Sequence, residues 1–288
     1  MYYLLSLLSG ILVSVMVAFN GGLTEQYGVY SATVIIHIAG LLLITAMTVI
    51  KRDRPFAKRH AWYLYLGGVI GVMTTAFNNL AFSRISVSSI LALGLFGQSI
   101  AGLIFDQYGL MNVPKHPFNK RKIYGLILIL LGLISMTNNF DVLAVVISFF
   151  AGVNIVVSRT LNAKLAECTS VRTGTFYNYV TGLLISVLVC LLFGRGEAAF
   201  ESFVLSPRIY IYFGGIFGVC IVLLSNMTVM KISAFYLSLF LFIGQVFSGI
   251  LIDVVITGTF SPRNLIGGVF VALGLCVNLL LDRKSAAA

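Results

Sequence analysis

The feature that most constrains this chain is a series of apolar segments that recurs from one end to the other. A helix of about 20 residues crosses the hydrocarbon core of a bilayer. Inside lipid, only helices and closed barrels satisfy every backbone polar group. The sequence therefore predicts an all-α polytopic membrane protein with ten transmembrane helices. Their predicted bounds are 3–24, 29–50, 62–82, 86–108, 122–138, 141–162, 171–193, 209–229, 233–256 and 264–281.

Composition excludes the soluble classes. Charged residues make up 10% of the 288 residues, against about 25% in ordinary soluble proteins. Ten spans leave no room for a soluble catalytic domain. The net charge of +10 does not indicate nucleic-acid binding, because the basic residues lie in short loops between apolar spans. The four cysteines have no metal-ligand spacing, so we expect neither a metal nor a cofactor. The first apolar segment is interpreted as a span and not as a cleaved signal peptide.

Lysine and arginine predict the orientation. With ten spans, 15 of the 19 basic residues fall on the side of the N-terminus and four on the opposite side. Cytoplasmic loops of membrane proteins carry the excess of basic residues. We therefore expect both termini in the cytoplasm, loop 51–61 inside and loop 194–208 outside, in a multi-pass protein of the cytoplasmic membrane.

An internal repeat is the strongest signal in the sequence. A shift of 142 residues places 10–42 over 152–184, so that Asn20 meets Asn162 and Glu25 meets Glu167. A shift of 147 residues places 65–106 over 212–253. In the second alignment, Gly97-Gln98-x3-Gly102-x3-Asp106 meets Gly244-Gln245-x3-Gly249-x3-Asp253. Polar residues and glycines that match in order across five consecutive spans indicate duplication.

Each repeat has five predicted helices, and an odd number turns the second copy upside down in the bilayer. The chain is therefore divided into a first five-helix repeat, 1–140, and a second, inverted repeat, 141–284. The last residues, 285–288, are interpreted as a cloning remnant outside the fold. Inverted repeats of this kind are typical of secondary transporters.

Three sets of motifs resemble the drug/metabolite transporter superfamily, and within it the YdcZ-like branch of fused five-plus-five-helix chains. They are the Asn-x-x-Leu ends of spans 1 and 6, the Gly-Gly-x-x-Gly starts of spans 3 and 8, and the Gly-Gln pairs of spans 4 and 9. The run 105–110, which closes span 4, also fits the resemblance. The resemblance implies a central cavity lined by spans 1, 3, 4, 6, 8 and 9, and it leaves the substrate open.

Polar side chains inside a membrane are costly and therefore mark candidate sites. Amides both donate and accept hydrogen bonds, so they suit a neutral or zwitterionic solute. They also join helices to each other, and this structural role remains an alternative. The substrate-binding candidates are the repeat-matched amides Gln98 and Gln245, Asn20 and Asn162, and Asn79 and Asn226.

The deep part of span 1, Leu12–Val17, has no carboxylate, which disfavours exchange of protons for cations. The remaining charged or titratable candidates for gating or coupling lie mostly near span ends, where caps, solvated loops or snorkelling are the alternatives. They are Glu25, Glu167, Asp106, Asp253, Arg159 and His37.

The function favoured by these features is transport of a small organic solute by alternating access, by a monomer or a homodimer. A channel or scaffold is less favoured, because a channel needs a continuous ring of like polar groups. An integral-membrane enzyme is disfavoured, because His60 and His116 stand alone in basic loops. The chain lacks the Gly-rich motif that binds nucleotide phosphates in ATP hydrolysis.

Overall fold

The computed structural model describes residues 2–53, 55, 60–110, 122–136, 141–201, 204–229 and 234–286. The described part is helical throughout and contains no strand. The first half contains α1 (Tyr2–Tyr27), α2 (Val29–Ile50), the 3-10 turn η2 (Trp62–Tyr65), α3 (Leu66–Phe82), α4 (Val87–Tyr108) and α5 (Lys122–Met136). The second half contains α6 (Val142–Cys168), α7 (Val171–Phe193), α8 (Ala198–Glu201), η4 (Ile209–Phe213), α9 (Gly214–Val229), α10 (Ala234–Thr257) and α11 (Pro262–Ala286).

The observed helices follow the predicted spans, with three differences. Helix α6 continues to Cys168, beyond the predicted end at 162, and its last turns carry the half-buried Lys164 and the exposed Glu167. Helix α11 continues to Ala286, into the segment interpreted as a remnant. The short helix α8 lies in the loop between α7 and α9, where none was predicted.

Local sequence explains where the helices begin and end. Ser86, Asp141 and Ser170 are the N-caps of α4, α6 and α7, and each side chain accepts a hydrogen bond from the backbone three residues later. These bonds satisfy amides that have no partner inside the helix. Gly28, with φ 93°, separates α1 from α2, and Gly109, with φ 61°, ends α4. Glycine adopts this left-handed conformation without steric cost.

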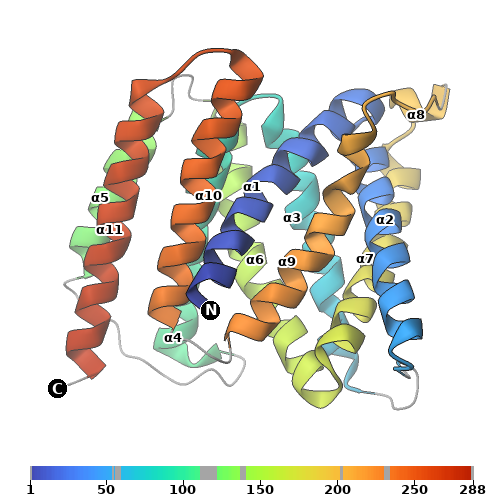
Figure 1. Ribbon diagram of the computed structural model, residues 1–288, viewed down its shortest axis with the longest axis horizontal. Helices are drawn as coiled ribbons and strands as arrows, with labels where there is room; N and C mark the ends of the chain where they lie inside the picture. The colour runs from blue at the N-terminus through green and yellow to red at the C-terminus, as the bar shows by residue number, and fades with distance from the viewer. Residues whose placement is uncertain are drawn as a thin grey trace.

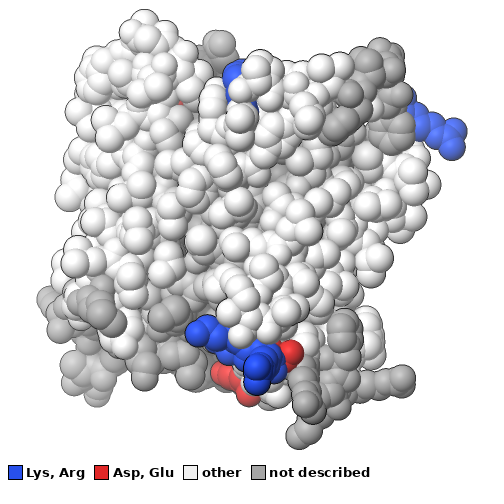
Figure 2. Space-filling model, turned by 45° about the vertical axis from the view of Figure 1, so that its right-hand side comes forward, with Lys and Arg blue, Asp and Glu red and all other residues white. Residues whose placement is uncertain are grey.

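Seven described helices are long and apolar enough to cross a membrane, and three shorter apolar helices accompany them. The seven are Tyr2–Tyr27, Val29–Ile50, Trp62–Phe82, Val87–Phe105, Val142–Cys168, Val171–Phe193 and Phe240–Thr257. The shorter ones are Ile123–Met136, Ile209–Ser225 and Pro262–Asn278. Figure 2 shows charged residues at the two ends of one face, with a broad uncharged belt between them. This distribution fits a protein whose middle lies in lipid.

The helices form one bundle with a clear order (Figure 1). Helices α5 and α11 pack against each other at one side, and α2 packs against α7 at the other side. Between them, α1 packs against α9 and α10, and α6 packs against α3 and α4. The first helix of each half thus contacts helices of the other half, so the centre of the bundle contains α1, α3, α4, α6, α9 and α10.

Candidate functional site

Two close helix crossings define the centre of the bundle. At the first, Gly97 of α4 meets Gly152 of α6, and a Cβ atom on Gly152 would lie 2.9 Å from the backbone nitrogen of Gln98. At the second, Gly244 of α10 meets Gly10 of α1, and a Cβ atom on Gly10 would lie 2.9 Å from the backbone nitrogen of Gln245. At 1.5 Å per residue, these glycines lie about 12–15 Å from the starts of their helices, near the middle of a bilayer about 30 Å thick.

The predicted amides Gln98 and Gln245 lie at these crossings. Gln245 is 4% exposed, and Gln98 is half-buried. Within the described part of the chain, neither side-chain amide has a hydrogen-bond partner. The glycine before each Gln leaves space for the backbone of the facing helix. Each crossing therefore holds a glutamine amide whose donors and acceptor are free.

Asn162 is held in a polar corner where α3 begins. Its Nδ2 donates to Asn178 Oδ1 at 2.9 Å and to Ser158 Oγ at 3.3 Å. Ser158 Oγ in turn donates to the Gly67 carbonyl at 2.8 Å. A Cβ atom on Gly67 would overlap Asn162 Oδ1, so the glycine admits the amide. This corner joins α6, α7 and α3, and the Asn162 donor is already occupied.

Asn20 lies in the equivalent corner where α9 begins, against Gly214. It is 5% exposed, and its Oδ1 has no partner among the described residues. Its Nδ2 also lacks the two bonds that Asn162 Nδ2 makes, because Met16 and Ile36 stand where the acceptors Ser158 and Asn178 stand in the second half. Asn20 is therefore a buried acceptor without a donor, which is rare unless a ligand or water completes it.

Asn79 and His37 lie away from the crossings. Asn79 is 2% exposed and donates to Thr33 Oγ1 at 3.3 Å. His37 Nδ1 lies 2.8 Å from the Thr33 carbonyl; a carbonyl only accepts, so Nδ1 carries the proton. The His37 ring covers Gly182, and Tyr179 covers Gly40 in the reciprocal position. Asn79 and His37 thus join α2 to its neighbours. The side chain of Asn226 lies outside the described residues.

Of the predicted carboxylates, Asp253 makes the most specific contact. Its Oδ1 accepts from Val87 N at 2.8 Å and its Oδ2 from Ser88 N at 3.0 Å. The carboxylate of α10 therefore caps α4, a helix of the other half, and a negative charge is favourable at a helix N-terminus. Nearby, Asn264 Nδ2 donates to Ser88 Oγ at 3.1 Å. Together these bonds fasten one end of α4 to α10 and α11.

The other charged candidates are placed differently. Glu25 and Glu167 are exposed near the ends of α1 and α6. Arg159 is half-buried two thirds of the way along α6, and it has no ion-pair partner in the part of the chain that the structure describes. The backbone of Asp106 lies in α4, but its side chain falls outside the described residues.

Two contacts were missed from the sequence. Asn178 lies inside a predicted span, and the cost of polar groups in lipid marks it as a candidate. It has no polar match in the repeat, because its counterpart is Ile36. Glu197, in the loop after α7, accepts from Tyr30 N at 2.8 Å, from Ser31 N at 2.8 Å and from Ser31 Oγ at 2.7 Å. No local signal pairs Glu197 with the start of α2.

Comparison with known proteins identifies the family. A sequence model of the family described as "Putative inner membrane exporter, YdcZ", within the drug/metabolite transporters, matches residues 1–135 and again residues 143–277. The chain belongs to this family. It is a transmembrane transport protein of the inner membrane, and the resemblance inferred from the Asn, Gly-Gly and Gly-Gln motifs is confirmed. The two matched segments correspond to the two halves of the chain.

Other comparisons concern the fold. A search of curated proteins found no match. A solved structure described only as the crystal structure of a protein is similar over 98% of both chains, with a TM-score of 0.70 and 15% sequence identity. At this identity the similarity shows the shared fold alone.

Proposed function

We propose that this protein is a secondary transporter that exports a small neutral or zwitterionic organic solute by alternating access between two inverted five-helix repeats. The observation that carries the proposal is that the glutamine amides at two equivalent helix crossings have no hydrogen-bond partner among the described residues. The proposal gives the chain transport and no catalysis, and it requires no cofactor or metal.

Reciprocal contacts support the repeat architecture. The Gly97–Gly152 crossing joins α4 to α6, and the Gly244–Gly10 crossing joins α10 to α1 in the same way with the halves exchanged. Helices α5 and α11 cross each other at two glycine pairs, Gly125–Gly274 and Gly132–Gly267, which the repeat also exchanges. An axis in the membrane plane that relates 1–140 to 141–284 accounts for these pairs together.

The solute site is proposed at the bilayer midplane, between α1, α9 and α10 on one side and α3, α4 and α6 on the other. Gln98 and Gln245 bracket it, and Asn20 supplies an acceptor without a partner. Amides bind donors and acceptors without fixing a charge, so they favour a neutral or zwitterionic solute. Asn162, Asn79 and His37 are assigned to holding the helices, because their bonds are made within the protein.

The bond between Asp253 and α4 supports a gate. It joins helices of opposite halves at one end of the bundle, where alternating access requires a contact that forms in one state and breaks in the other. The repeat places Asp106 at the equivalent position of α4, so a twin contact with the start of α10 would close the opposite end in the other state.

Orientation follows from the loops. Both chain termini lie toward one end of the bundle, and α8 lies at the other (Figure 1). The excess of basic residues predicts that the end bearing the termini faces the cytoplasm, and the family description supports export from that side.

A flux assay tests the proposal. The purified protein is reconstituted into liposomes, and a panel of radiolabelled metabolites is screened for uptake into vesicles preloaded with the unlabelled compound. A transporter gives saturable uptake that the preloaded solute accelerates, because loaded carriers return faster than empty ones. Flux that neither saturates nor responds to preloading would indicate a channel. Absence of flux for every compound, with a folded protein, would contradict transport of these solutes.

A further inference from the structure

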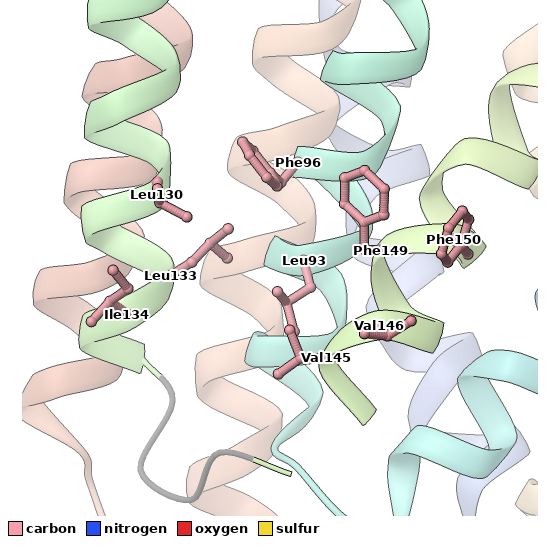
Figure 3. A pocket seen from close by; sticks show the side chains of 9 residues that line it. All are labelled: Leu93, Phe96, Leu130, Leu133, Ile134, Val145, Val146, Phe149 and Phe150. Carbon is pink, nitrogen blue, oxygen red and sulfur yellow. The ribbon is translucent and has the colours of Figure 1, made fainter. Parts of the chain in front are cut away.

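A cavity of about 220 Å³ lies between α4, α5 and α6, beside the Gly97–Gly152 crossing, where Phe149 contributes to both. Side chains of α5 face those of α4 and α6 across it (Figure 3). Every residue that lines it is apolar: Leu93, Phe96, Leu130, Leu133, Ile134, Val145, Val146, Phe149 and Phe150. An apolar cavity of about 150 Å³ in another protein stays free of water and takes up benzene, so a hydrocarbon is the ligand that this lining fits.

The cavity opens to the surface that faces lipid. Its floor is buried, with Leu93 5% and Leu133 3% exposed, whereas its rim is not, with Leu130 45% and Phe150 49% exposed. The exposed rim residues belong to the apolar helices α5 and α6, so in a membrane they meet the bilayer. The molecules present at such a rim are lipids.

The depth of the cavity in the membrane indicates which part of a lipid it can bind. Leu93 and Phe96 lie about 9–14 Å along α4 from its first residue, at 1.5 Å per residue. This depth is below the headgroup layer and inside the hydrocarbon core. The cavity volume is smaller than that of sites for whole drug-sized ligands, which have roughly 300 Å³ or more. A segment of one acyl chain matches both the depth and the volume.

The two halves differ at this place. Val145 and Leu93 correspond to Tyr3 and Phe240 in the repeat alignment. The rings of Tyr3 and Phe240 pack with centroids 5.4 Å apart, so two aromatic side chains occupy the position that Val145 and Leu93 leave open. The cavity therefore depends on the smaller side chains of Val145 and Leu93, and the fold alone does not require it.

We propose that this cavity binds an acyl chain of a membrane phospholipid, inserted from the bilayer between α5 and α6. The bound chain fills the gap that Leu93 and Val145 leave, and it couples α5 to α4 and α6 where direct packing is incomplete. This site is separate from the solute site and does not depend on the proposed transport function.

Photocrosslinking tests the proposal. The full chain is reconstituted into vesicles of phosphatidylcholine that carries a diazirine in the middle of one acyl chain, and the adducts are mapped by mass spectrometry. The expected result is an excess of adducts on the cavity residues over Leu188 of α7, which is 51% exposed to the same lipid. The double variant Leu93→Phe/Val145→Tyr, which copies the filled position, should reduce the cavity adducts to the level of Leu188.

The reciprocal variant Tyr3→Val/Phe240→Leu provides a gain of signal, because it opens the filled position and should create new adducts on α1 and α10. Monodispersity and Tm identify folded variants, and Leu93→Phe alone replaces the double variant if that variant does not fold. Equal labelling of the cavity and Leu188 in the wild type would overturn the proposal. So would cavity adducts that persist in the filled variant, or a reciprocal variant that gains none.

Discussion

Asn20 and Asn162 match in the repeat alignment, yet among the described residues only Asn162 makes hydrogen bonds with its side chain. Asn162 bonds to Asn178 and Ser158, whereas Asn20 Oδ1 has no partner in the described structure. An amide that is bonded inside the protein holds helices together, and an unpaired one is available to a ligand. We therefore expect the two positions to differ in role, with Asn162 structural and Asn20 open to a ligand.

This difference predicts different effects for the same substitution. Asn162→Leu leaves Asn178 Oδ1 without its donor and should destabilise the protein by about 1–2 kcal/mol. Asn20→Leu removes no hydrogen bond and should leave Tm near that of the wild type, while it weakens solute binding. Thermal unfolding in detergent and flux in liposomes measure the two effects. Equal losses of stability in both variants would show that Asn20 is also structural.

The two glutamines are predicted to act on transport more than on folding. Gln98→Leu and Gln245→Leu each remove an amide that would bond the solute, which should cost about 1–3 kcal/mol of binding. This corresponds to roughly a 5- to 150-fold loss of affinity. Expression and Tm should change little, because neither amide has a partner among the described residues. Both variants transporting at the wild-type rate would place the site elsewhere.

At the scale of the helices, glycine explains why α1 and α6 contact the opposite half so closely. Gly152→Ala should be destabilising by about 1–3 kcal/mol, because the new methyl group overlaps the Gly94 carbonyl and lies 2.9 Å from Gln98 N. Gly102→Ala, on α4 itself, is the matched control, since no atom lies within 4 Å of its Cβ position. Thermal unfolding of the two variants tests this prediction. Equal Tm values would mean that the crossing tolerates a wider spacing between the two helices.

The contact between α10 and α4 predicts how the gate responds to charge. Asp253→Asn removes the negative charge from the start of α4, so that end of the bundle should open more often. A cysteine at Val87, which is 2% exposed, should then react faster with a membrane-impermeant maleimide in a background without native cysteines. Glu167→Gln changes an exposed carboxylate and serves as the control. Unchanged labelling of position 87 would exclude this contact as a gate.

The ion pair between Asp53 and Arg172 joins α7 to the loop after α2. Arg172 Nε donates to Asp53 Oδ2 at 2.5 Å, and this bond lowers the pKa of the Asp53 carboxyl below its ordinary value of 3.8. A lowered pKa contributes stability that is present above 3.8 and is lost as the pH falls through the lower, folded value. The pair is partly exposed, so its contribution is about 1 kcal/mol or less. The Tm difference between wild type and Asp53→Asn should therefore be constant at neutral pH and shrink only in strong acid.

For the whole molecule, the seven long apolar helices could be predicted because each is long enough to cross a bilayer. The glycines of the two crossings match in the repeat, but the helices that they bring together are known only from the structure. Side-chain partners could not be predicted where the halves differ, as with Asn178 opposite Ile36. The contact of Glu197 with the start of α2 also could not be predicted, because it joins residues 167 positions apart in the sequence. The cavity beside Leu93 depends on side-chain volumes that only the packed structure compares.

The division into inverted repeats also stays a prediction, and membrane topology is its most direct test. Inserted with the termini in the cytoplasm, the chain has 15 of its 19 basic residues on that side, and this excess sets orientation. Ala61→Cys, on the side of loop 51–61, should be protected from an impermeant maleimide in intact cells. Gly196→Cys should react, because it lies in the opposite loop and no atom lies within 4 Å of its Cβ position. Both residues are exposed in the structure, so a difference between them reports the membrane and not local burial. Labelling of position 61 from outside would reverse the orientation, and with it the side on which Asp253 closes the bundle.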